Sequence, residues 1–155
     1  MSLDAWRITK RKHGRTAFTG EGARLYGGRW NTPGVAMVYA AETQSLAALE
    51  MLVHLDVPAL LDRYVLLEVG IEPALILQLD LKEWPRDWRE SPSPGRLRDI
   101  GDAWIEAGKS VAFRVPSALV PHEGNILLNP KHPDFGRLRV GRPVPFRFDP
   151  RLLRK

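Results

Sequence analysis

The sequence predicts one α+β domain over residues 1–155, built from short strands in mixed or antiparallel pairing and two main helices. A chain of 155 residues has the size of one ordinary domain with its own core. Short apolar runs recur between turn residues, and only two stretches carry the apolar spacing of a helix. Strands and helices do not alternate strictly, which argues against a doubly wound parallel sheet.

The first third of the chain predicts a strand, a long loop, a second strand and a helix. Residues 5–9 form the opening strand, and residues 10–34 are rich in glycine and polar side chains without a clear period. Long irregular segments in compact domains are often binding loops. Residues 35–40 form an apolar strand, after which Thr43 caps a helix that runs to Leu55. The buried stripe of this helix is expected to contain Leu46, Leu49, Leu52, Val53 and Leu55.

The rest of the chain predicts two neighbouring strands, a second long helix and several later strands. The two strands cover residues 64–69 and 75–79. Ser93 caps the helix, Pro94 occupies its first turn and Gly108 ends it. The helix is expected to bury Leu97, Ile100, Trp104 and Ile105. The later strands are expected at residues 111–115, 125–128, 137–140 and 146–148.

The composition is that of a globular protein and excludes several kinds of site. Hydrophobic residues make up 44% and charged residues 26%, and there is no cysteine. The chain therefore forms no disulfide, thiolate metal site or cysteine nucleophile. Residues 1–13 lack the apolar core of a signal peptide, and no window reaches the roughly 20 apolar residues of a membrane span. We expect a cytoplasmic protein that contacts no membrane.

The net charge of +5 favours an anionic ligand or an acidic partner. The 23 Lys and Arg residues are interleaved with 18 Asp and Glu residues, so no basic stripe indicates nucleic acid. No G-x-G-x-x-G motif follows a strand and no P-loop is present, which argues against the commonest nucleotide sites. We expect no direct contact with nucleic acid.

The run from Gly22 to Asn31 holds two arginines among glycines and aromatic residues. Glycines allow sharp bends and a close approach of the backbone to a ligand. Arg24 and Arg29 carry flat, permanently charged guanidinium groups that suit phosphate oxygens, and aromatic faces suit a flat heterocycle. The run therefore predicts a pocket for a nucleotide or dinucleotide.

Five blocks along the chain, taken in order, resemble the RES-domain family. The blocks are Gly28-Arg29-Trp30-Asn31, Val38-Tyr39-Ala40-Ala41-Glu42, Leu46-Ala47-Ala48-Leu49-Glu50, Val115-Pro116-Ser117 and residues 125–135. The family is named for an arginine, a glutamate and a serine, which would be Arg29, Glu50 and Ser117 in this chain. The blocks cover most of the sequence at compatible spacing. Trp30 is a departure, since a tyrosine is common there in better-known members.

The resemblance implies a single RES-type domain with a fold similar to that of ADP-ribosyltransferases. It implies a toxin of a bacterial toxin–antitoxin pair, with an Xre-type helix-turn-helix antitoxin as partner and a homodimer as one arrangement within that complex. The implied chemistry is consumption of NAD by hydrolysis or phosphorolysis of the nicotinamide–ribose bond. NAD is then the substrate, and no cofactor is expected. Some relatives instead transfer ADP-ribose to a protein.

The resemblance also implies roles for individual residues. Arg29 would bind the diphosphate of NAD, and the ring of Tyr39 would stack on nicotinamide. Glu50 would stabilise the positive charge that develops on the ribose carbon, and Ser117 would fix a substrate oxygen. The further substrate-binding candidates are Arg24, Trp30 and Asn31.

Each of these residues also has a purely structural interpretation. Arg29 could tie down its own loop, and Tyr39 could be an ordinary half-buried strand residue. Trp30 could cover the edge of the core. Glu50 could face solvent on its helix, and Ser117 could bond the backbone of its own turn.

Other residues and functions complete the set of expectations. Arg7 is a weaker candidate for the same anionic ligand, and a surface or structural role is the favoured interpretation. His122, His132 and Asp134 resemble metal ligands, but nine residues separate the two histidines and no usual zinc spacing is matched, so no metal is expected. Two other functions stay open: a protein ADP-ribosyltransferase that uses the same NAD pocket, and a non-enzymatic module that binds a partner.

Overall fold

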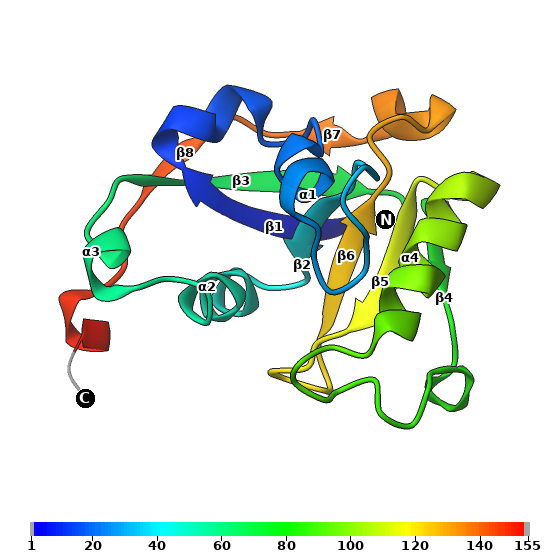
Figure 1. The fold of residues 1–155 in the computed structure, drawn as a ribbon. Coiled ribbons are helices and arrows are strands. Elements are labelled where there is room, and N and C mark those ends of the chain that lie inside the picture. The colour runs from blue at the N-terminus through cyan, green and yellow to red at the C-terminus, as the bar shows by residue number, and fades with distance from the viewer. Residues whose placement is uncertain (1, 154–155) are drawn as a thin grey trace.

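A mixed sheet of eight strands runs through residues 2–153, the part of the chain that the structure describes (Figure 1). The structure is a computed structural model. The strand order is β4-β5-β6-β2-β1-β3-β7, and β8 also pairs with β3. Pairing is antiparallel except between β4 and β5, which are parallel. The strands are β1 (Leu3–Lys10), β2 (Val38–Ala41), β3 (Tyr64–Ile71), β4 (Ile76–Gln78), β5 (Ala112–Pro116), β6 (Gly124–Leu128), β7 (Arg139–Val140) and β8 (Val144–Phe146).

Within the same range, two longer and two shorter α-helices accompany the sheet. In the view of Figure 1, α4 runs beside β4 and β5, and α2 lies below β1 and β2. The helices are α1 (Glu21–Tyr26), α2 (Gln44–Leu52), α3 (Val57–Leu60) and α4 (Gly95–Ala107). The predicted α+β class, with short strands and two main helices, is confirmed.

The first long helix, α2, begins where the sequence predicts and ends earlier. The side-chain oxygen of Thr43 accepts a hydrogen bond from the backbone N–H of Leu46 at 3.0 Å, which is the expected cap. The helix ends at Leu52 rather than at Leu55. The reason is that Asp56 caps a separate short helix, α3, so the chain changes direction between the two.

The predicted apolar stripe of α2 is only partly buried. Leu46 is 1% exposed and packs against the sheet with Ala47. Leu49 is 43% exposed and Val53 is 55% exposed, so the expectation that these two residues are buried is wrong. Periodicity identifies the apolar side of a helix but does not say how much of that side a neighbour covers.

The second long helix, α4, differs from the prediction at its start. It begins at Gly95 after Pro94, and Ser93 makes no capping hydrogen bond, so the predicted Ser93 cap is wrong. Leu97 is buried as expected. Gly108 ends the helix in the left-handed region, at φ 62°, which confirms the predicted stop.

The loop that carries Trp30 lies directly against α4. A Cβ atom on Gly101 would be 1.7 Å from the backbone oxygen of Trp30, so only glycine permits this approach. The Trp30 ring is held between the helix and the sheet, in an aromatic cluster with Trp84 and Phe113.

The other elements differ from the prediction mainly in their limits. The 10–34 segment contains a 3-10 helix (Arg11–Thr16) and α1, each of six residues, which is too short for a periodic signal. The strand expected at 35–40 begins only at Val38, as β2. The strands expected at 137–140 and 146–148 are Arg139–Val140 and Val144–Phe146.

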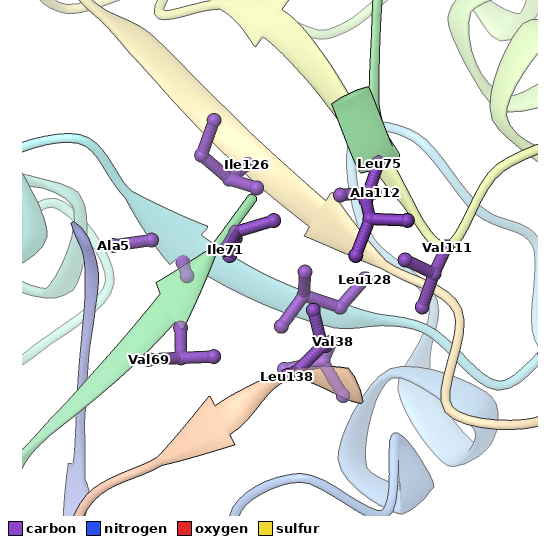
Figure 2. Packing of buried hydrophobic residues seen from close by; sticks show 11 residues of the cluster. Ala5, Val38, Val69, Ile71, Leu75, Val111, Ala112, Ile126, Leu128 and Leu138 are labelled. Carbon is purple, nitrogen blue, oxygen red and sulfur yellow. The ribbon is translucent and has the colours of Figure 1, made fainter. Parts of the chain in front are cut away.

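The register of the sheet decides which side chains share a face. Apolar side chains of β2, β3, β5 and β6 meet on one face, as Figure 2 shows. On the opposite face, Tyr39 of β2 stands across from Leu127, and Ala41 stands across from Asn125. Ala41 packs in the cluster that contains Leu46 of α2. Because residues opposite one another point to the same side, Asn125 lies on the face that α2 covers.

Candidate functional site

Glu50 lies on the partly buried side of α2 and faces the loop between β5 and β6. Its Oε1 accepts two hydrogen bonds, from Ser117 Oγ at 2.8 Å and from Asn125 Nδ2 at 2.9 Å. Within residues 2–153, no hydrogen bond to Oε2 is found, and Oε2 is not among the buried polar atoms without a partner. One oxygen of the carboxylate is therefore fixed, and the other is open to solvent or a ligand.

Ser117 directly follows β5 and is 0% exposed. Its Oγ accepts hydrogen bonds from the backbone N–H groups of Leu119 and Val120, both at 3.1 Å. The single hydroxyl proton points to Glu50. Ser117 is thus both a turn serine and a residue that orients Glu50, and in this structure the hydroxyl is not free to hold a substrate oxygen.

The start of α2 is attached to the same loop by a second set of polar contacts. Arg114 of β5 binds both oxygens of Glu42 at 2.8 Å, and the backbone N–H of Gly124 donates to the same carboxylate. Thr43 Oγ1 donates to Glu123 at 2.8 Å. Burial opposes ionisation of Glu42, but the bonds from Arg114 and Gly124 outweigh it, and the pKa of Glu42 lies below its ordinary value. These contacts set the position of α2 over the strands that supply Ser117 and Asn125.

Tyr39 and Asn31 form a closed polar cluster. The Tyr39 hydroxyl donates to Asn31 Oδ1 at 2.6 Å and accepts the backbone N–H of Trp30 at 3.1 Å. The Asn31 amide nitrogen donates to the backbone oxygens of Ala23, Thr32 and Val35. Burial is the largest cause that raises the pKa of Tyr39. The phenol therefore stays neutral and serves to hold the loop against β2.

Two of the predicted substrate-binding residues need correction. Asn31 is 0% exposed and its amide is fully used inside the protein. Trp30 is 1% exposed, and its ring packs edge-on against Trp84 with centroids 5.2 Å apart. Both side chains are part of the scaffold, because the loop folds inward over the sheet rather than presenting them to a ligand.

Arg29 contacts a segment that leads toward Glu50. Its Nη1 donates to the backbone oxygens of Trp88 and Glu90, both at 3.2 Å. Between them, Arg89 donates to the backbone oxygen of Ala118, which follows Ser117. Figure 1 shows this segment passing next to the β5–β6 loop. Within residues 2–153, no hydrogen bond or ion pair joins Arg29 to Glu50. The 88–90 segment that Arg29 binds is linked through Arg89 to Ala118, next to the Ser117 that contacts Glu50.

Arg24 is less available to bind an anionic substrate than the sequence suggests. Its guanidinium forms a two-point ion pair with Glu21, one turn away on α1. Both side chains are accessible to solvent, so the pair is a surface contact whose charge is already compensated.

Arg7 is the candidate for which the sequence favoured a surface or structural role over binding of the anionic ligand. It lies on β1, where β1 and β2 separate after their single paired position, Trp6 with Ala41. Its guanidinium donates to the backbone oxygens of Ala17 and Tyr39, at 2.8 and 2.9 Å. No ion pair to Arg7 is found among the described residues, and burial lowers its pKa to about 10. The available signal was a charged side chain between the apolar residues Trp6 and Ile8.

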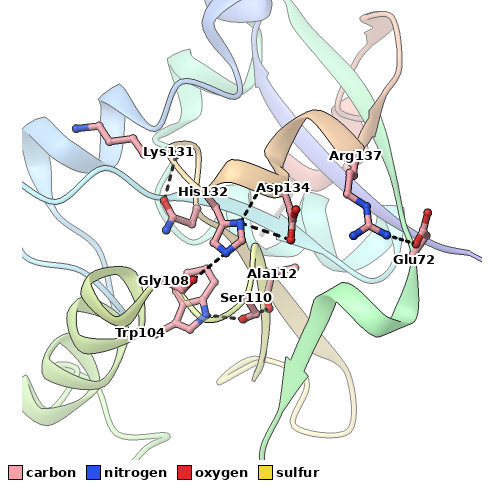
Figure 3. A network of polar contacts seen from close by, with 10 residues as sticks. Glu72, Trp104, Gly108, Ser110, Ala112, Lys131, His132, Asp134 and Arg137 are labelled. Atoms are coloured by element: carbon pink, nitrogen blue, oxygen red, sulfur yellow. Dashed lines mark hydrogen bonds and ion pairs between the residues drawn. The ribbon is translucent and has the colours of Figure 1, made fainter.

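The histidine considered as a metal ligand has a structural role. His132 Nε2 bonds the backbone oxygen of Gly108 at 2.9 Å, and Nδ1 accepts the backbone N–H of Asp134 at 2.9 Å (Figure 3). These bonds join the 129–134 turn to the end of α4. Among residues 2–153, no cluster of three or more metal-binding side chains is found, and no helix has the length and apolar character that crossing a membrane requires.

Two surface hollows lie outside the Glu50 cluster. One is lined by Lys10, Arg11, Lys12, Asp62 and Arg63. The other is lined by Gln78, Leu79, Trp84, Arg114, Pro116, Pro121 and His122. Neither has Glu50 or Ser117 among its lining residues, and the polar contacts rather than the hollows identify the candidate site.

Comparison with known proteins decides the family. The RES domain family matches residues 4–149. The chain belongs to the RES domain family. A protein named "Toxin Res" from Yersinia enterocolitica is 44% identical over 95% of this chain and 97% of its own length. Another protein of that name from Photorhabdus laumondii is 39% identical over 96% of each chain.

Two further comparisons bear on activity and fold. A protein named "Prs ADP-ribosylating toxin" from Sphingobium sp. is 35% identical to this RES domain over 100% of this chain and 99% of its own length. The crystal structure of the M. tuberculosis MbcT-MbcA toxin-antitoxin complex contains a similar chain, with a TM-score of 0.77 at 19% identity. The match covers 95% of this chain and 85% of that chain, and it supports the fold.

In this RES domain, the three residues of the family name do not form one cluster. Glu50 and Ser117 are in direct contact, while Arg29 is hydrogen-bonded to the backbone oxygens of Trp88 and Glu90. Sequence reasoning missed Asn125, although it lies in one of the blocks that carry the family resemblance. Its only sequence signal is a polar side chain at the start of an apolar strand.

Proposed function

We propose that this RES domain is the toxin of a toxin–antitoxin pair and that it cleaves the nicotinamide–ribose bond of NAD. The observation that carries the proposal is the state of the Glu50 carboxylate, with Oε1 held by two donors and Oε2 open. A carboxylate fixed in this way is suited to stabilise a positive charge that develops next to it.

The reaction breaks the bond between the ribose carbon and the nicotinamide nitrogen. The electron pair leaves with nicotinamide, which departs as a neutral molecule, so no general acid is needed. The ribose carbon becomes cationic, as in other glycoside cleavages. Oε2 of Glu50 accepts a hydrogen bond from the adjacent ribose 2-hydroxyl, and this bond strengthens as the charge develops. Water or inorganic phosphate then forms a C–O bond at the same carbon; water loses its proton to solvent.

Cationic and aromatic groups outside the Glu50 cluster are the candidates for binding the rest of NAD. Arg29 and Arg7 are the candidates for the diphosphate, since their guanidinium groups are held on backbone oxygens rather than on carboxylates. The ring of Tyr39 is the candidate for contact with nicotinamide, while its hydroxyl keeps its structural bonds.

The test is product analysis with purified protein and NAD, in buffers with and without inorganic phosphate. Nicotinamide release in both buffers supports the proposal. ADP-ribose as the second product indicates hydrolysis, and a phosphorylated ADP-ribose indicates phosphorolysis. Intact NAD after prolonged incubation, with protein of native fold, contradicts the proposal.

Transfer of ADP-ribose to a protein is the second candidate, because the Sphingobium relative is named an ADP-ribosylating toxin. The two reactions share bond cleavage and differ in the acceptor. Incubation with NAD labelled in the adenosine part, in the presence of cell lysate, separates them. A labelled protein band identifies transfer, and label only in small molecules identifies hydrolysis or phosphorolysis.

An antitoxin partner of Xre type is part of the proposal, supported by the toxin–antitoxin complex among the structural neighbours. The net charge of +5 suits a partner with an acidic contact surface, and the pair would act in the cytoplasm. Co-purification with the neighbouring gene product at rising salt tests this. A stable complex, together with NAD that stays intact when the free protein is assayed without its partner, would instead favour a non-enzymatic binding module.

A further inference from the structure

Asn125 contacts Glu50 from β6, whereas Ser117 contacts it from the loop after β5. It lies at the start of β6, paired with Ala41 of β2 and Val115 of β5, and its side chain is partly buried. Its Nδ2 is 2.9 Å from Glu50 Oε1. An ionised carboxylate only accepts hydrogen bonds, so the amide nitrogen rather than the amide oxygen must face it. The orientation of the Asn125 side chain follows from this contact.

Two donors on one oxygen determine the direction of the whole carboxylate. Ser117 approaches Oε1 from the loop after β5, and Asn125 approaches it from β6. Ser117 is itself held by two backbone N–H groups. Because Ser117 is held by two backbone bonds and Asn125 lies within β6, the two donors limit the rotation of the Glu50 side chain and favour one orientation of Oε2.

The Asn125 contact is not needed to hold α2 in place. The start of the helix is attached through Glu42 and Thr43, and its middle packs on the core through Leu46 and Ala47. Loss of one amide contact therefore leaves the helix where it is, and the effect falls on the Glu50 carboxylate.

We infer that Asn125 is a positioning residue for the proposed NAD cleavage, holding Glu50 Oε1 together with Ser117 so that Oε2 meets the ribose. This inference rests on the proposed function. Asn125 acts through Glu50 and does not itself touch the reacting atoms. A pair of donors that orients a reactive group in this way raises the rate of the chemical step more than the affinity for substrate.

The first test compares Asn125→Ala and Asn125→Asp with the wild type. Asn125→Asp keeps the shape, removes the donor and adds a repelling charge. Because a hydrogen bond to a charged group is lost, kcat is expected to fall about 10- to 100-fold, with KM within about threefold. The matched control is Asn129→Ala, directly after the other end of β6, where the amide oxygen accepts the backbone N–H of Lys131. The control should retain wild-type kcat. Equal kcat for Asn125→Ala and wild type, or equal losses in both alanine variants, would overturn the inference.

The second test asks whether Asn125 acts through Glu50. In a double-mutant cycle with Glu50→Gln, Asn125→Ala should lower the residual kcat by less than about twofold, because the carboxylate to be positioned is gone. Additive losses would overturn the inference. A second cycle, with Glu50→Ala in place of Glu50→Gln so that the acceptor itself is removed, is compared by denaturant unfolding, which needs no activity. If the wild type does not cleave NAD, the proposed function fails. Non-additive unfolding free energies would still support Asn125 as the residue that orients Glu50. Additive unfolding free energies would then refute this positioning role as well.

Discussion

Two polar clusters on the sheet contain residues predicted to bind or cleave NAD, and they differ in one respect. In the cluster of Asn31 and Tyr39, the side-chain polar atoms are bonded within the protein. In the cluster of Glu50, Ser117 and Asn125, the hydrogen bonds converge on one carboxylate oxygen and leave the other open. The first cluster is closed, and the second leaves one carboxylate oxygen free to accept a further hydrogen bond.

The difference shows why a buried polar residue in a conspicuous motif is not necessarily a binding residue. Buried polar groups must be paired, so a network that satisfies itself is the ordinary way to fold a loop without regular structure. The loop of Asn31 contains short helices and an isolated bridge between Gly28 and Asn31, but it joins no strand among residues 2–153. The Asn31 amide supplies further bonds to the loop backbone. A functional carboxylate needs the opposite arrangement, with partners that orient it and an oxygen that they leave free.

The largest expected effect comes from removing the open carboxylate. Glu50→Gln should lower kcat for NAD cleavage by about 10²- to 10³-fold, the usual loss when one group that stabilises a developing charge is removed. The fold should persist, since the amide can still accept bonds from Ser117 and Asn125. Rates are measured by nicotinamide release. Glu106→Gln, an exposed change on α4, is the control and should retain full activity. Undiminished turnover by Glu50→Gln would contradict a role in the reaction for the Glu50 cluster.

A smaller effect, on stability rather than rate, is expected from the closed cluster. Asn31→Ala leaves three backbone oxygens and the Tyr39 hydroxyl without their partner, which should lower the free energy of unfolding by about 2–4 kcal/mol. Denaturant unfolding measures it. If Asn31→Ala unfolds like the wild type but requires far more NAD, Asn31 contacts the substrate and the comparison fails.

Tyr39→Phe separates the ring of Tyr39 from its hydroxyl. The free energy of unfolding should fall by about 1–2 kcal/mol, because Asn31 Oδ1 and the Trp30 N–H lose their partner. NAD turnover below the unfolding temperature should stay within about threefold of wild type, because the ring remains. Tyr26→Phe, at an 82% exposed tyrosine, is the control and should change neither quantity. A large loss of kcat in Tyr39→Phe would assign the phenol to the chemistry.

The smallest effect concerns the attachment of α2 and depends on pH. The pKa of Glu42 is lowered in the folded protein, so its contribution to stability is present above the unfolded value of 4.5 and is lost as pH falls through the folded value. The difference in unfolding free energy between wild type and Glu42→Gln should therefore be constant near neutral pH and shrink below about pH 4.5. Denaturant unfolding curves between pH 3 and 7 measure this difference, which is expected to be close to the precision of such curves. A difference that grows on acidification would contradict the Arg114–Glu42 attachment.

Local signals in the sequence predict much of this fold. The Thr43 cap, the Gly108 stop and the apolar strand runs are short-range features, and the structure confirms them. The Ser93 cap, the burial of Leu49 and Val53, and the limits of the later strands were wrong. Each of these depends on which neighbours cover an element, and periodicity carries no information about neighbours.

For the site, the sequence by itself determined the fold class, the two helices and the presence of Glu50 and Ser117 in blocks typical of the RES family. Only the tertiary structure decided that Ser117 and Asn125 share Glu50 Oε1, that Trp30 and Asn31 turn inward, and that Arg7 sits without an acidic partner among residues 2–153. The physical reason is separation along the chain. Glu50 meets partners that lie 67 and 75 residues away, and only the pairing of the strands brings them within hydrogen-bond distance.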